Sequence, residues 1–175
     1  MELITIKKFI PPIIFLGAPF LVFLYINLQN NFLFNLLFIA LACGWIYLSV
    51  EDISKLSVPT IPLYVISFMT IILAILQQQT LISYLLILFM LVIIFTLILI
   101  ANIVTKKNLM GSADYIVIGS LAFTLIPNLI GPWLLLSASL PLIGILLSQK
   151  KKSEKLPFIP YLTVSWMLIS TINYH

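Results

Sequence analysis

Two aspartates, Asp52 and Asp114, each stand beside a strongly apolar run, in the stretches EDISKLSVP and LMGSADYIVIG. A carboxylate in or at the edge of a membrane is costly and usually has a function. Two carboxylates that share one proton can hydrolyse a peptide, because the ionised one takes a proton from water while the protonated one polarises the carbonyl. The sequence therefore predicts acid–base chemistry, provided that the fold brings the two side chains together.

The composition predicts a membrane protein. The chain has 175 residues, of which 62% are hydrophobic and 8% charged, whereas a soluble domain is nearer a quarter charged. A single cysteine, Cys43, excludes an intrachain disulfide and a cysteine zinc site. The one histidine is His175, at the end of the chain, so we expect no metal and no cofactor. The net charge of +4 comes from lysines between apolar segments, and we expect no nucleic-acid partner.

The apolar runs predict an all-α helix bundle of about seven transmembrane segments. They are expected at residues 9–28, 32–50, 58–76, 80–104, 114–129, 131–148 and 157–173. The stretch PNLIGP at 127–132 predicts a tight turn between the fifth and sixth segments. We interpret the first segment as a retained helix and not a signal peptide, because no small-residue cleavage site follows it. This divides the chain into an N-terminal transmembrane helix, 1–31, and a membrane domain of six spans, 32–175.

The lysines predict the orientation. With seven spans every lysine falls on one side, which the positive-inside rule makes cytoplasmic. They are Lys7, Lys8, Lys55, Lys106, Lys107, Lys150, Lys151, Lys152 and Lys155. All five acidic residues fall on the same side, and the connections on the other side carry no charge. We therefore expect the N-terminus and both aspartates at the cytoplasmic face and the C-terminus outside.

The residues after Asp52 form a first motif. Lys55 follows it, and Val58 and Pro59 open the next apolar segment. Proline suits the first turn of a helix, because that turn does not need its missing N–H.

Two further motifs are expected on the same face of the membrane. The small residues Gly111, Ser112 and Ala113 precede Asp114 and let the backbone approach the carboxylate closely. In the third motif, Pro157 and Pro160 surround Phe158 and stiffen the entry to the last segment.

These three motifs, in this order, resemble those of the type IV prepilin peptidases, which are membrane aspartyl proteases of the GxGD class. The resemblance extends over roughly residues 32 to 173 and implies that Asp52 and Asp114 are catalytic. The other motif residues would support them. The chain departs from the family pattern at Thr60, Ala113, Tyr115 and Ile159.

The resemblance implies an aspartic endopeptidase of the bacterial inner membrane, active at the cytoplasmic face. Its partners would be type IV pilin-like precursors, from which it removes a basic leader, and membrane lipid. No cofactor is implied. Many family members carry a cytoplasmic region with paired cysteines for N-methylation, which this sequence does not contain, so we expect no methyltransferase activity.

Four other interpretations remain open. Asp114 can be a plain helix cap, with Asp52 an interfacial residue beside Lys55. The pair can belong to a presenilin-like intramembrane protease, although such enzymes typically have Tyr before the first Asp, where this chain has Glu51. The carboxylates can couple cations in a transporter, or the chain can be an inactive assembly factor.

Overall fold

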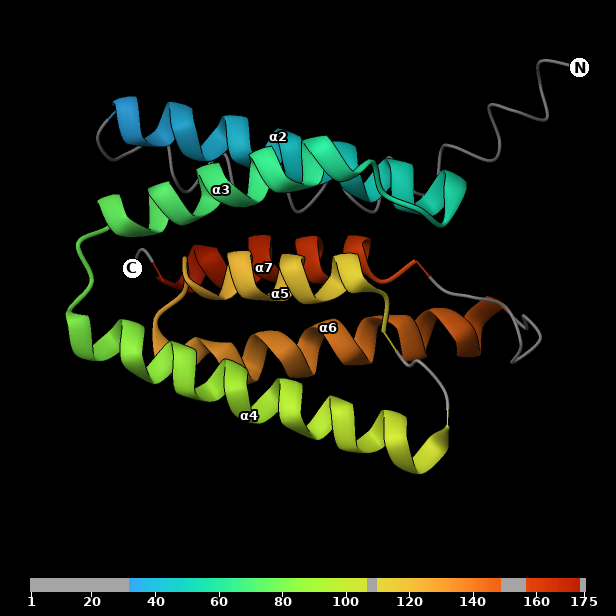
Figure 1. Ribbon diagram of the computed structural model, residues 1–175. Coiled ribbons are helices and arrows are strands. Elements are labelled where there is room, and N and C mark those ends of the chain that lie inside the picture. Colours follow the sequence, from blue (N-terminus) through green and yellow to red (C-terminus); the bar gives the residue numbers. More distant parts are fainter. Residues whose placement is uncertain (1–31, 107–109, 149–156, 174–175) are drawn as a thin grey trace, which may run out of the picture.

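The computed structural model describes residues 32–106, 110–148 and 157–173, and every regular element within them is an α-helix (Figure 1). The helices are α2 (Phe32–Lys55), α3 (Thr60–Leu76), α4 (Leu81–Thr105), α5 (Ser112–Ala122), α6 (Pro127–Ser148) and α7 (Ile159–Asn173). The predicted all-α class is therefore confirmed. The helix expected at 9–28, and with it the N-terminal unit 1–31, lies outside the described residues.

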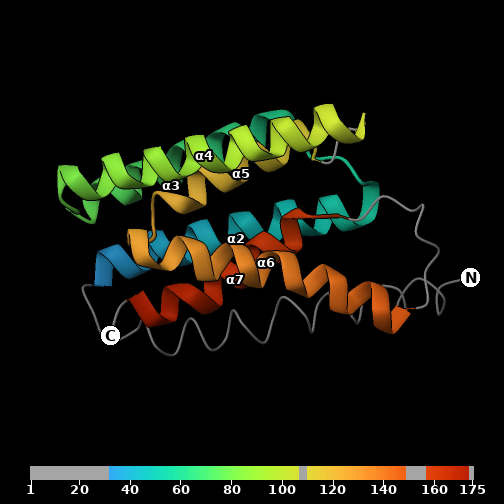
Figure 2. The same cartoon turned by 90° about the horizontal axis from the view of Figure 1, so that it is seen from below.

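The helices run alternately up and down and form two layers. One layer holds α3, α4 and α5, and the other holds α2, α6 and α7 (Figure 2). The short helix α5 contacts both α3 and α4, and α7 contacts both α2 and α6. Contacts between α2 and α3, between α5 and α7, and between α4 and α6 join the layers. The two central helices, α5 and α7, therefore face each other in the middle of the bundle.

Alternation places the end of α2 and the starts of α5 and α7 at the same end of the bundle, on the right in Figure 1. The charged residues within the described part of the chain lie at or near this end. They are Glu51, Asp52, Lys55, Lys106 and Asp114. We call it the charged end. At the opposite end, the turns at 77–80 and 123–126 carry no charge.

Buried tryptophans join the helices through hydrogen bonds. Trp45 of α2 donates its indole N–H to Thr70 of α3, at 3.0 Å. Trp166 of α7 donates to Thr124 in the α5–α6 turn, at 2.7 Å, and Trp133 of α6 donates to a carbonyl oxygen of α7. All three indoles are fully buried. A buried indole N–H needs such a partner, so these bonds define which helix faces pack together.

The outer faces of α3 and α4 are apolar and exposed. Large side chains such as Ile61, Phe68, Phe89 and Val104 point away from the bundle. Two helical stretches, Leu36–Lys55 and Leu81–Thr105, are long and apolar enough to cross a membrane. The apolar helices α3, α5 and α7 are shorter.

The predicted turn at 127–132 is wrong. Helix α5 ends at Ala122, the chain turns at 123–126, and α6 begins at Pro127. Bonds of the i to i+3 type tighten the end of α5. Proline fits the first helical position, because its N–H would have no helical acceptor there. Pro132 lies inside α6, so the local turn signal was overridden by the longer helix.

Gly44 provides a test of the contact between α2 and α3. A Cβ at Gly44 would lie 3.1 Å from the side chain of Ile66, whereas nothing lies within 4 Å of one at the exposed Gly131. Gly44→Leu is expected to lower the free energy of unfolding by about 1–3 kcal/mol through overpacking. Gly131→Leu should not lower it. Thermal unfolding in detergent, followed by tryptophan fluorescence, measures both. Equal melting temperatures would show that the two helices are not in close contact at Gly44.

Candidate functional site

Asp52 lies in the last turn of α2, which continues to Lys55 and not only to residue 50 as expected. The side chain is 8% exposed. Its Oδ2 accepts a hydrogen bond from the backbone N–H of Ile159, at 3.2 Å, and the N–H of Phe158 is a second backbone donor. Because α7 begins at Ile159, its first N–H groups have no acceptor within the helix. The carboxylate therefore caps a second helix, whose positive end favours its negative charge.

Asp114 lies in the first turn of α5. Its Oδ2 accepts a hydrogen bond from the N–H of Gly111, at 2.9 Å. Gly111 is the N-cap residue and has no side chain to return a bond, so the arrangement is half of a capping box. The helix cap considered from the sequence is therefore present. It engages one oxygen of the carboxylate and does not by itself exclude a chemical role.

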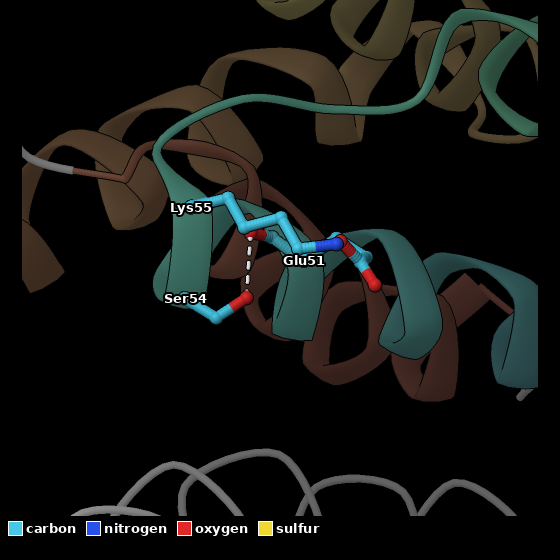
Figure 3. Close-up of polar contacts among 3 residues, drawn as sticks. All are labelled: Glu51, Ser54 and Lys55. Carbon is cyan, nitrogen blue, oxygen red and sulfur yellow. Dashed lines mark hydrogen bonds and ion pairs between the residues drawn. The ribbon is translucent and has the colours of Figure 1, made fainter.

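The two carboxylates lie close enough for the charge of Asp52 to act on Asp114. Among the side chains that the structure describes, the one ion pair joins Lys55 to Glu51, with 2.7 Å between Nζ and Oε2. This pair lies on the surface of α2 (Figure 3). Lys55 is thus engaged with Glu51 and does not neutralise the aspartates. Two carboxylates that lie near each other repel, so a pair of this kind is more stable when it holds a single proton.

The residues of the three sequence motifs lie around these carboxylates at the charged end. Val58 and Phe158 are half-buried and pack against the core, as does Ala113. The other positions fall at helix starts. Pro59 immediately precedes α3, Gly111 and Ser112 start α5 and are exposed, Pro157 precedes α7 and is half-buried, and Pro160 lies in the first turn of α7 and is buried. The fold therefore brings together motifs that are far apart in the sequence.

A pair of hydroxyls beside Asp52 was not predicted from the sequence. Ser49 Oγ lies 3.1 Å from Thr163 Oγ1, and both side chains are fully buried. Ser49 is one turn before Asp52 on α2, and Thr163 is one turn after Ile159 on α7. Residues three or four apart share a helix face, so this periodicity was the available signal. It was not decisive, because the sequence alone does not show that α2 meets α7.

Within the described residues, no group of three or more His, Cys, Asp or Glu side chains is placed to hold a metal ion. The chemistry that the arrangement offers is proton transfer between water and the two carboxylates at this end of the bundle.

The cap on α5 separates the structural role of Asp114 from a chemical one. Asp114→Ala removes the acceptor of the Gly111 N–H and is expected to cost about 1 kcal/mol of stability. Asp114→Asn keeps a side-chain oxygen at the same place, so its melting temperature should stay near that of the native protein. Thermal unfolding of the three proteins in one detergent measures this. If the Asn variant is as unstable as the Ala variant, the cap requires the charge and not only the acceptor.

No family model, no curated protein and no solved structure matches this chain.

Proposed function

We propose that this protein is a membrane aspartyl endopeptidase of the prepilin peptidase type. It cleaves the basic leader from type IV pilin-like precursors at the cytoplasmic face of the bacterial inner membrane. The observation that carries the proposal is that the fold places Asp52, at the end of α2, and Asp114, at the start of α5, at the same end of the bundle, together with the bond from Ile159 of the third motif to Asp52. If each motif were only a feature of its own loop, nothing would require the three motifs to lie at the same end of the bundle.

The pair has the groups that peptide hydrolysis needs. The ionised carboxylate takes a proton from water, whose oxygen adds to the scissile carbonyl. The protonated carboxylate donates a hydrogen bond to that carbonyl. When the C–N bond breaks, a proton passes to the leaving amine. A carboxylic acid and an amine result, and the dyad returns to its singly protonated state.

The surface supports a place in the membrane. Exposed apolar side chains cover α3 and α4, and apolar patches of such extent on a protein mark contact with lipid or a partner. Seven spans then place every lysine on the cytoplasmic side. Helix α5 has 11 residues, and so rises about 16 Å, roughly half of a hydrocarbon core. This length is compatible with a position of Asp114 at the membrane edge, which the proposal requires so that water and a cytoplasmic leader can reach it.

The test is a cleavage assay in membranes. The protein is co-expressed with a pilin-like precursor that has a basic leader ending in glycine, and separately with a single transmembrane helix that lacks a leader. We expect the precursor to be cut after the glycine and the bare helix to remain intact, as mapped by mass spectrometry. A cut inside the bare helix would favour the presenilin-like alternative. A folded protein that cuts neither substrate would contradict the proposal and favour a transporter or assembly role.

A further inference from the structure

We propose that the buried hydroxyl pair of Ser49 and Thr163 positions Asp52. By fixing the end of α2 against the start of α7, it keeps the Asp52 carboxylate on the N–H of Ile159. The two hydroxyls act through Asp52 and are positioning residues. This inference rests on the proposed function in that Asp52 is one of the two reacting carboxylates.

Two hydrogen bonds join α2 to α7 at the charged end. The first is the bond from the Ile159 N–H to Asp52 Oδ2, at 3.2 Å, and the second is the bond between Ser49 and Thr163, at 3.1 Å. The helices run in opposite directions and contact each other (Figure 1). The residue one turn before Asp52 on α2 therefore lies opposite the residue one turn after Ile159 on α7. These two polar contacts add to the packing of Phe38 on Trp166 between the same helices and specify their register at the charged end.

The buried Ser49 hydroxyl has two hydrogen-bond acceptors within reach. Ser49 Oγ lies 2.8 Å from the carbonyl oxygen of Trp45, in its own helix, as well as 3.1 Å from Thr163 Oγ1. Ser49 has one proton to donate. Ser49 is the donor in both contacts, so this proton is shared between the Trp45 carbonyl and Thr163 Oγ1. Removing the Thr163 hydroxyl leaves Ser49 bonded only to Trp45 within α2, so the side-chain hydrogen bond that joins α2 to α7 at this level is lost.

The bundle contains a matched control of the same chemistry. Thr124 accepts a bond from Trp166, at 2.7 Å, and is 1% exposed. It lies in the turn at 123–126, at the end of the bundle away from the aspartates. Thr124→Val and Thr163→Val thus each delete one buried threonine hydroxyl and keep the shape of the side chain. A purely structural role predicts the same consequences for both.

The first readout is kinetic. We expect Thr163→Val to lower kcat about tenfold or more with little change in KM, because a small misplacement of a reacting group is costly. Thr163→Ser restores the hydroxyl and should stay within about twofold of the native kcat. Thr124→Val should also keep kcat within about twofold, although it lowers the melting temperature. If Thr163→Val and Thr124→Val lose kcat equally, the hydroxyl pair is only structural and the inference is overturned.

The second readout does not depend on cleavage. A hydrophobic carbodiimide labels membrane carboxyl groups, and peptide mass spectrometry quantifies the label on Asp52. We expect Thr163→Val to change the labelling rate about fivefold, the factor that one lost hydrogen bond typically represents. Thr163→Ser and Thr124→Val should label like the native protein. Unchanged labelling in Thr163→Val overturns the inference, whatever the cleavage assay shows. If the native protein cuts no precursor but the labelling changes as expected, the proposed function fails and the positioning role stands.

Discussion

Replacing either aspartate with asparagine is expected to lower the cleavage rate constant at least about 1,000-fold, as removal of a catalytic group typically does. Asn has nearly the size of Asp, and its side-chain oxygen can accept the same N–H, from Ile159 at position 52 or from Gly111 at position 114. It cannot take or hold a shared proton. The proposed mechanism requires both the base and the acid in the same turnover, so either change alone should abolish cleavage.

Glu51→Gln is the matched control for Asp52→Asn. Glu51 is the adjacent residue, and its carboxylate is paired with the exposed Lys55. Surface pairs contribute little, so this variant should cut at close to the native rate. The double variant with Asn at both aspartates should be no slower than either single one, because groups that act as a unit are not additive. Cleavage that survives either single change, in a protein with native melting temperature, would rule out the two-aspartate mechanism.

The helices themselves could be predicted from the sequence, but one turn could not. Long apolar runs bounded by polar connections gave α3 and α4 to within a few residues, because a run of that length has little alternative to a helix. The α5–α6 turn was misplaced because 127–132 contains proline and glycine, the usual turn residues. The local sequence does not distinguish a proline at the start of a helix from a proline in a turn. Packing of α6 against α7 is a tertiary effect that no local signal contains.

The common location of Asp52 and Asp114 could be predicted from the sequence, whereas their hydrogen-bond partners could not. The spacing of motifs and helices indicated that Asp52 and Asp114 would share one end of the bundle. It did not indicate that α7 would donate its first N–H groups to Asp52. A backbone donor cannot be recognised from the type of residue that carries it. Nor did it indicate that Lys55 would pair with Glu51 in place of an aspartate. That pairing is local, since the two are four residues apart on one helix face.

The bond from Ile159 leads to the second large expected effect. Ile159→Pro removes the backbone N–H that Asp52 accepts, while proline remains compatible with the first position of α7. We expect a loss of about 100-fold in kcat, the cost that a misplacement of about 1 Å typically has. The effect should be smaller than that of Asp52→Asn, because the carboxylate is still present and Phe158 still offers its N–H.

The Ile159 side chain is 1% exposed, so its loss must be separated from the loss of the N–H. Ile159→Ala provides this control, because it creates a cavity at the same place and keeps the donor. It is expected to cost about 2–5 kcal/mol of stability and, assayed well below its melting temperature, to retain most of the native kcat. If the Pro and Ala variants lose kcat equally, the packing of Ile159 and not its N–H is what cleavage requires. If only the Pro variant fails, the start of α7 is part of the catalytic arrangement. The late Pro-Phe-x-Pro motif then acts through its backbone, which is why Ile159 can occupy the position where the family pattern has glycine.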